Sequence, residues 1–126
     1  MRTFLAILLL TVPALAQAPD PHSIPIVDAG LGPCTADFTI TGPDGKPVYN
    51  AKISVRIAYG FLNAHKLDLE VGTNIDGKAR FTNLPNRLKH GIFFEAADGD
   101  RTGSAFDDPS KTCTPQFPIT IRKPPQ

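Results

Sequence analysis

The nine residues AKISVRIAY at positions 51–59 decide the fold of this 126-residue chain. Apolar and polar side chains alternate along this segment, and the apolar set is Ile53, Val55, Ile57 and Tyr59. A strand places successive side chains on opposite faces, so a period of two predicts a strand that is buried on one face. No window shows the sustained i, i+3, i+4, i+7 apolar spacing of a helix. The sequence therefore predicts an all-β protein.

Six further segments have the length and composition of strands. They cover residues 34–40, 67–71, 78–82, 92–97, 102–106 and 117–122. The Ile-Phe-Phe run at 92–94 alternates least, which predicts a strand covered on more than one side. Asp-Gly pairs at 44–45, 76–77 and 98–99 have the composition of tight turns, because Gly tolerates positive φ there. We expect a seven-stranded, antiparallel or mixed Greek-key β-sandwich, transthyretin-like or immunoglobulin-like.

Cys34 and Cys113 are the two cysteines of the chain. In an oxidising compartment two thiols are expected to pair with each other. Metal ligation and an intermolecular bridge are the alternatives, although the spacing lacks a CxxC metal motif. Each cysteine precedes a predicted strand, at 34–40 and 117–122. An internal disulfide therefore predicts that these two strands are parallel neighbours, with Cα atoms of the cysteines within about 7 Å of each other.

The first residues have the pattern of an export signal. Arg2 precedes an apolar run at 4–10, which is too short for the roughly 18 to 20 residues of a spanning helix. We expect a secretory signal peptide at residues 1–16, cleaved after Ala16, and cleavage after Ala18 is the alternative. This signal predicts a secreted or periplasmic protein.

Composition divides the rest of the chain into three parts. Repeated Pro and Gly predict a flexible leader at 17–33, followed by the β-sandwich domain at 34–122 and a short tail at 123–126. Of 13 basic and 12 acidic side chains, only Arg2 lies in the expected signal, so the exported chain is near neutral. Nucleic acids and anionic membranes require a clustered basic excess. We therefore expect no nucleic-acid partner and no stable membrane insertion after cleavage.

Several motifs resemble the carboxypeptidase regulatory-like domain. They are GPDGKPV at 42–48, NAKISV at 50–55, TNIDGKARF at 73–81 and Leu84-Pro85. That family has a transthyretin-like sandwich, so the resemblance implies this fold over roughly residues 38–97. It also implies a non-catalytic module with a binding or structural role, in the cell envelope or outside the cell. We expect no cofactor, and an unknown protein or glycan of the envelope as the partner.

The chain departs from the family pattern at two connections. Residues 86–90 intervene before the strand that begins near Gly91, and the connection 60–66 is longer and more apolar than usual. Both are either tolerated insertions or contact surfaces, because loops tolerate lengthening and also carry function. The candidate partner-binding loop consists of Phe61, Leu62, His65 and Lys66. The candidate basic contact consists of Arg87, Lys89 and His90.

Other functions have weaker sequence support. A transthyretin-like hydroxyisourate hydrolase would need His65, His90 and Arg80 to converge, and the C-terminal Tyr-Arg-Gly-Ser motif of those enzymes is missing. A carbohydrate-binding module would need exposed rings, for which Tyr49, Tyr59 and Phe61 are the candidates, although the register of Tyr59 predicts burial. We expect no metal site, because the histidines lack metal-ligand spacing and the Asp98 turn has Pro109 at the twelfth position of a calcium loop.

The predicted processing has a direct test. Mass spectrometry of the exported protein should find an N-terminus at Gln17 and a mass lower by two hydrogens than that of the reduced chain. An unprocessed chain, or two free thiols after export, would contradict the prediction.

Overall fold

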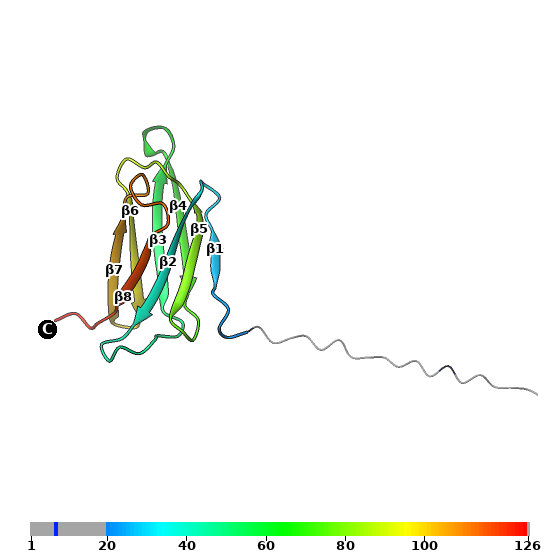
Figure 1. Ribbon diagram of the computed structural model, residues 1–126. Coiled ribbons are helices and arrows are strands. Elements are labelled where there is room, and N and C mark those ends of the chain that lie inside the picture. Colours follow the sequence, from blue (N-terminus) through cyan, green and yellow to red (C-terminus); the bar gives the residue numbers. More distant parts are fainter. Residues whose placement is uncertain (1–6, 8–19, 126) are drawn as a thin grey trace, which may run out of the picture.

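The computed structural model describes residue 7 and residues 20–125. These residues form eight strands and one short 3-10 helix (Figure 1). Apart from Ile7, the expected signal at 1–16 with its cleavage site lies outside the described residues, and so do positions 17–19 of the expected leader. Within the described part of the chain, no helix is long and apolar enough to span a membrane.

The first layer is a mixed four-stranded sheet in the order β1-β5-β2-β8. Its strands are β1 (Ile26–Asp28), β5 (Lys78–Leu84), β2 (Cys34–Thr41) and β8 (Gln116–Thr120). β2 is antiparallel to β5, whereas the β1–β5 and β2–β8 pairs are parallel.

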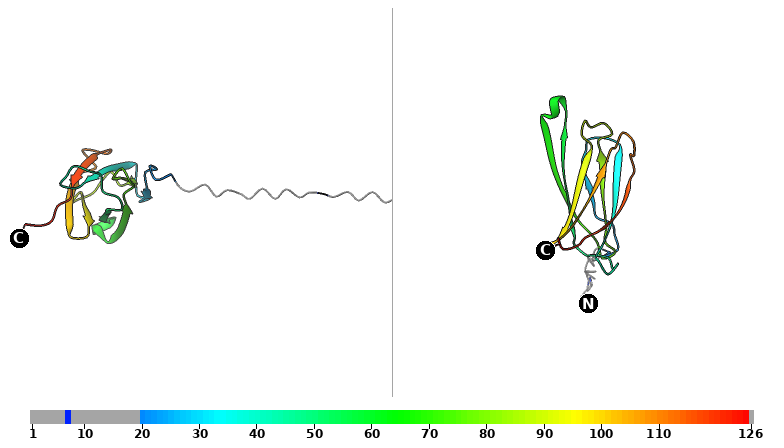
Figure 2. Two further views of the ribbon diagram at one scale, coloured as in Figure 1. Left: turned by 90° about the horizontal axis from the view of Figure 1, so that it is seen from below. Right: turned by 90° about the vertical axis from the view of Figure 1, so that its left-hand side faces the viewer.

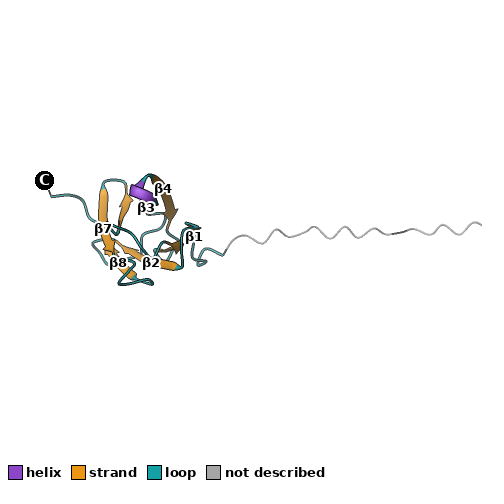
Figure 3. Ribbon diagram, turned by 90° about the horizontal axis from the view of Figure 1, so that it is seen from above, coloured by secondary structure: helices purple, strands orange, loops and turns teal. Residues whose placement is uncertain are grey.

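The second layer is an antiparallel sheet in the order β4-β3-β6-β7. Its strands are β4 (His65–Gly72), β3 (Lys52–Tyr59), β6 (Ile92–Asp98) and β7 (Arg101–Asp107). Figure 3 looks along the molecule and shows the two layers facing each other. The prediction of an all-β, mixed sandwich is confirmed.

The hydrophobic core lies between the two sheets. Alternate residues of β2 and β3 are buried, as a period of two requires. Phe38 of β2 contacts the rings of Phe81, Phe94 and Phe117, with centroids 5.9, 4.9 and 5.5 Å away. Such aromatic pairs contribute about 0.5–1.5 kcal/mol each beyond the burial of their area. The four rings come from β2, β5, β6 and β8, so this cluster joins both layers.

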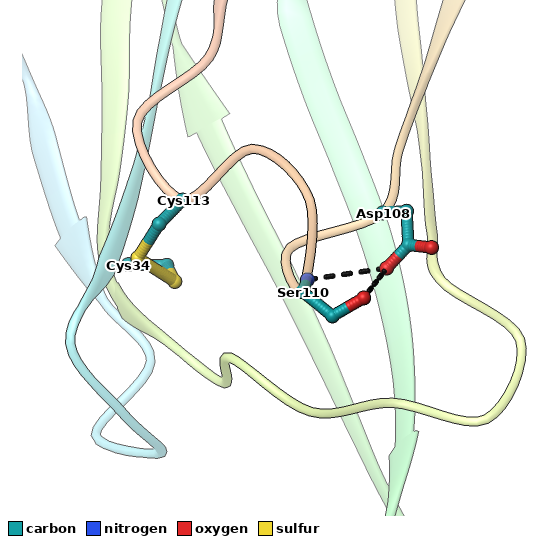
Figure 4. The surroundings of a disulfide bond; sticks show 4 residues. All are labelled: Cys34, Asp108, Ser110 and Cys113. Atoms are coloured by element: carbon teal, nitrogen blue, oxygen red, sulfur yellow. Dashed lines mark hydrogen bonds between the residues drawn. A yellow bond between two sulfur atoms is a disulfide. The ribbon is translucent and has the colours of Figure 1, made fainter.

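The disulfide joins Cys34 to Cys113, and the Cα atoms are 4.7 Å apart (Figure 4). The amide of Thr35 donates a hydrogen bond to the carbonyl of Cys113, 2.9 Å away. β2 and β8 then run parallel as neighbours, beginning with Asp37 opposite Gln116. The predicted internal pairing and the parallel arrangement of these strands are both confirmed.

The predicted count of seven strands was wrong, because β1 forms within the segment 17–33 that was expected to be a flexible leader. The side-chain amide of buried Asn74 donates hydrogen bonds to the carbonyls of His22 and Ser23, both at 3.1 Å. This anchor brings the segment alongside β5, where Val27 pairs with Phe81. Contacts with residues distant in the sequence therefore order a proline-rich stretch.

The expectation that the strand at 92–97 is covered on more than one side was also wrong. β6 alternates between buried and exposed positions, and Phe93 faces solvent with 57% of its surface exposed. Only Ile92, Phe94 and Ala96 face the core.

The β3–β4 hairpin extends beyond the rest of its sheet. β3 pairs with β4 over its whole length, but with β6 only from Lys52 to Val55. The right-hand view of Figure 2 accordingly shows the hairpin, in green, rising beyond the neighbouring loops. The described ends of the chain, near residues 20 and 125, both lie at the opposite end of the sandwich (Figure 1).

The Asp-Gly turns adopt the backbone conformation that their composition predicts. Gly45 has a φ of 79° and Gly77 a φ of 73°, both in the left-handed region. A Cβ atom at position 45 would meet nothing within 4 Å, whereas one at position 77 would clash with the backbone carbonyl oxygen of Ile40. The two glycines therefore separate the cost of backbone conformation from that of close packing.

We expect Gly77→Ala to lower the free energy of unfolding more than Gly45→Ala. The positive φ costs about 1–2 kcal/mol at either position, and the clash with Ile40 adds about 1–3 kcal/mol at position 77 alone. Urea denaturation of both variants measures the difference. Equal losses would contradict the close approach of Gly77 to β2.

Candidate functional site

The tip of the β3–β4 hairpin exposes two adjacent apolar side chains. The 3-10 helix η1 (Phe61–Asn63) forms this tip, and Phe61 and Leu62 are 86% and 85% exposed. Leu62 has a φ of 55°, in the left-handed region that costs a non-glycine residue about 1–2 kcal/mol. The sequence thus keeps two large apolar groups in water on a strained backbone, a combination typical of functional sites.

The base of the tip is supported by stacked rings. His65, the first residue of β4, lies opposite Tyr59 on β3, with ring centroids 5.4 Å apart and planes inclined by 27°. Tyr59 contacts the core but is only half-buried, so the burial that its register predicted is partial. Lys66 lies opposite Ala58 and is exposed. The hairpin is therefore anchored to the core just below its apolar tip.

The loop 85–91 lies beside this tip. Leu88 contacts the core, while Arg87, Lys89 and His90 are exposed. A cavity of about 330 Å³ is lined by Tyr59, Gly60, Leu62 and Asn63 of the hairpin and by Arg87, Leu88 and Lys89 of the loop. The structure thus brings Leu62 of the candidate partner-binding loop together with Arg87 and Lys89 of the candidate basic contact. Phe61, His65, Lys66 and His90 lie outside the cavity lining.

Three cations gather in two segments near the hairpin tip. The segments 60–66 and 85–91 carry Lys66, Arg87 and Lys89 and contain no acidic residue. At the opposite end, the aspartates of the turns are matched by an equal number of nearby cations. Hereafter, the tip surface means residues 60–66 and 85–91. The tip surface is locally basic although the chain as a whole is near neutral.

Two adjacent aspartates at the end of β7 have opposite electrostatic environments. Asp107 is only 6% exposed, and burial together with the neighbouring charge of Asp108 raises its pKa. Asp108 accepts hydrogen bonds from the hydroxyl and amide of Ser110, at 2.6 and 3.1 Å, and the hydroxyl bond lowers its pKa (Figure 4). This loop continues to Cys113, so the disulfide fixes its far end.

An aromatic pair that the sequence analysis missed lies on the outer face of the second sheet. Phe93 and Phe106 are directly opposite each other on β6 and β7, and Phe106 is 59% exposed. Two hollows of about 420 and 210 Å³ share Phe93 and Glu95 in their lining. A strict period of two from Ile92 would have placed Phe93 on this outer face.

An ion pair lies on the same outer face. The guanidinium of Arg56 donates two hydrogen bonds to Asp68, at 2.8 and 3.3 Å, and this contact lowers the pKa of Asp68. Both residues line the larger of the two hollows, together with Phe93. This face therefore combines exposed rings with charged hydrogen-bonding groups.

The three residues of the hydrolase alternative come from different elements of the fold. Arg80 forms an ion pair with Asp37 in the first sheet, whereas His65 begins β4 in the second sheet and His90 lies in the loop 85–91. No hydrogen bond within residues 20–125 joins any two of the three. Tyr49, a candidate ring for carbohydrate binding, is exposed near the end of the sandwich opposite the tip.

The possible calcium loop is a tight hairpin between β6 and β7. Asp98 pairs with Arg101, whose guanidinium lies 2.7 Å away, and Asp100 lies 3.7 Å from the ammonium group of Lys123. Among the described residues, no group of three or more His, Cys, Asp or Glu side chains is arranged to hold a metal ion.

The pH dependence of stability should distinguish Asp107 from Asp108. Because the folded pKa of Asp107 is raised, its contribution to stability decreases as pH rises above the ordinary carboxyl range. We therefore expect the free energy of unfolding of Asp107→Asn, taken relative to that of the wild type, to be higher at about pH 7 than at about pH 3. The folded pKa of Asp108 is lowered, so Asp108→Asn should show the reverse. Denaturation of both variants at the two pH values measures this, and the same trend in both would contradict the assignment.

Comparisons with known proteins add only the fold. No family model matches the chain, and no curated protein matches it. Among solved structures, 3-chlorocatechol 1,2-dioxygenase from Rhodococcus opacus superposes with a TM-score of 0.51 at 12% identity, over 90% of this chain and 69% of the enzyme.

Two catechol 1,2-dioxygenases are less similar. The enzyme from Pseudomonas arvilla gives a TM-score of 0.49 at 13% identity over 82% of this chain, and that from an Acinetobacter species, inhibited by bound mercury, gives 0.48 at 14% over 80%. This chain spans 60% and 59% of their respective lengths. The match to the Rhodococcus opacus enzyme, at 12% identity, indicates a similar fold and nothing about activity.

Proposed function

We propose that this chain is an exported, non-catalytic β-sandwich module that binds a component of the cell envelope through its tip surface. The resemblance of its turn motifs to carboxypeptidase regulatory-like domains favours such a role, with a protein or glycan as the partner. The internal disulfide is consistent with export, because such bonds persist in oxidising compartments.

The observation that carries this proposal is the exposure of Phe61 and Leu62 beside Arg87 and Lys89. Burying a large apolar side chain contributes about 1.5–3 kcal/mol to the free energy of folding. The folded chain lacks this contribution from Phe61 and from Leu62, because both side chains are exposed. Leu62 additionally occupies an unfavourable backbone conformation. A binding partner that covers the tip recovers the burial energy, and flanking cations increase its affinity for acidic groups.

A carbohydrate-binding role is the second candidate, at a different surface. The exposed pair of Phe93 and Phe106 offers flat apolar rings, and Arg56, Asp68 and Glu95 lie nearby on the same face. Apolar ring faces with a few well-placed polar groups are typical of small-ligand sites. These rings would replace Tyr49, Tyr59 and Phe61 as the sugar-stacking residues.

Crosslinking in the cells that export the protein, followed by mass spectrometry, tests both candidates. We expect the variant Phe61→Ser/Leu62→Ser to lose at least about 90% of the crosslinked partner, because two apolar contacts are removed. Phe93→Ser is the matched control, since it also removes an exposed ring from this sheet.

The outcomes separate the two surfaces. Loss of crosslinks in the tip variant alone supports the proposed function. Loss in Phe93→Ser alone supports the outer face as the binding surface, and unchanged crosslinks in both variants would reject both candidates.

A further inference from the structure

We infer that the tip surface docks reversibly onto an anionic lipid bilayer, with Phe61 and Leu62 entering the interfacial region. This inference rests on the proposed function and names the component to which the tip surface binds. It differs from the protein or glycan favoured by the sequence, because the segments 60–66 and 85–91 bring three cations together with two exposed apolar side chains.

The shape of the tip favours a soft, planar partner. Phe61 and Leu62 are adjacent in a three-residue helical turn at the end of a hairpin that rises beyond its neighbours (Figure 2). Phe61 lies outside the adjoining cavity, and Leu62, although it lines that cavity, is still 85% exposed. A protein partner would need a pocket matched to this protrusion, whereas a bilayer can accommodate it without one.

The charges of the tip surface complement an anionic bilayer. Lys66 is the second residue of β4, and Arg87 and Lys89 of the loop 85–91 line the cavity that Leu62 and Asn63 of the tip also line. With Phe61 and Leu62 inserted, these cations can reach the lipid headgroups. Segments 60–66 and 85–91 contain no acidic residue, and Asp107 and Asp108 lie beyond Gly91, where Asp107 pairs with Ile92. Basic residues near an anionic membrane surface each strengthen binding about fivefold.

Contact through the tip would orient the molecule. The turns between β2 and β3, β4 and β5, and β6 and β7 lie at the end remote from the tip. The aspartates of this remote end are balanced by the cations Lys46, Lys78, Arg101 and Lys123. Among the described residues, this end offers no counterpart to the exposed pair of Phe61 and Leu62. Membrane contact through the tip therefore places the described termini, which lie at the remote end, away from the bilayer (Figure 1).

Vesicle co-sedimentation of the exported protein tests this inference. The probes are vesicles of phosphatidylcholine alone and of phosphatidylcholine mixed with phosphatidylglycerol. We expect binding to the mixed vesicles, little binding to phosphatidylcholine, and weakening as salt is added. Phe61→Ser/Leu62→Ser should weaken binding at least about tenfold, and Lys66→Gln/Arg87→Gln/Lys89→Gln should weaken it by a factor of about 100.

The matched controls change the same chemistry elsewhere. Lys46→Gln/Lys78→Gln/Lys123→Gln removes three cations from the opposite end, and Phe93→Ser removes an exposed ring from the sheet face. Both should bind vesicles within about twofold of the wild type if the tip surface alone provides the contact. All substituted side chains are exposed, and thermal unfolding verifies that the variants fold.

The results distinguish this inference from the proposed function. Absence of binding to anionic vesicles, or equal weakening by tip and control variants, overturns the lipid assignment. If the protein does not bind anionic vesicles while crosslinking in cells still depends on Phe61 and Leu62, the partner is a protein or glycan and the proposed function stands. If both experiments fail, the proposed function fails as well.

Discussion

The contact of Phe38 with three other aromatic rings is the interaction on which the arrangement of the sheets depends. Phe81 lies on the strand antiparallel to β2, Phe117 on the parallel strand, and Phe94 on the opposing sheet. A shift of any of these strands by one residue would turn its ring away from the core, because side chains alternate between faces. The cluster therefore fixes register in both layers at once. The disulfide then holds the starts of β2 and β8 together, at the end that also carries the tip.

Most of the fold could be predicted from local pattern, and the exceptions have physical causes. The alternation at 51–59 and the Asp-Gly turns depend only on neighbouring residues, so they are readable in the sequence. β1 is not, because three residues after Pro25 become a strand only when Asn74 and β5 hold them. Phe93 was misassigned because an uninterrupted apolar run was given more weight than the period of two. The parallel β2–β8 pair was predictable since both cysteines precede their strands.

The candidate site was only partly accessible from sequence. Phe61 and Leu62 stand out because no strand register buries them, and Arg87 and Lys89 stand out as a basic run. That Leu62 shares a cavity with Arg87 and Lys89 depends on the way β3, β4 and the loop 85–91 meet in three dimensions. Net charge could not reveal the cations of the tip surface for the same reason, because it carries no information on where charges lie in three dimensions. The outer aromatic pair required the pairing of β6 with β7 to become visible.

The position of the two described chain ends has a practical consequence. Both leave the sandwich at the pole remote from η1 (Figure 1). Attachment at either end would thus leave the tip of the β3–β4 hairpin unobstructed, whether the attached group is a fluorescent label, an affinity tag or a fused domain. The protein, attached by either of these ends, presents Phe61 and Leu62 at the far end of the sandwich, and the eight residues of β3 set the distance between the two ends.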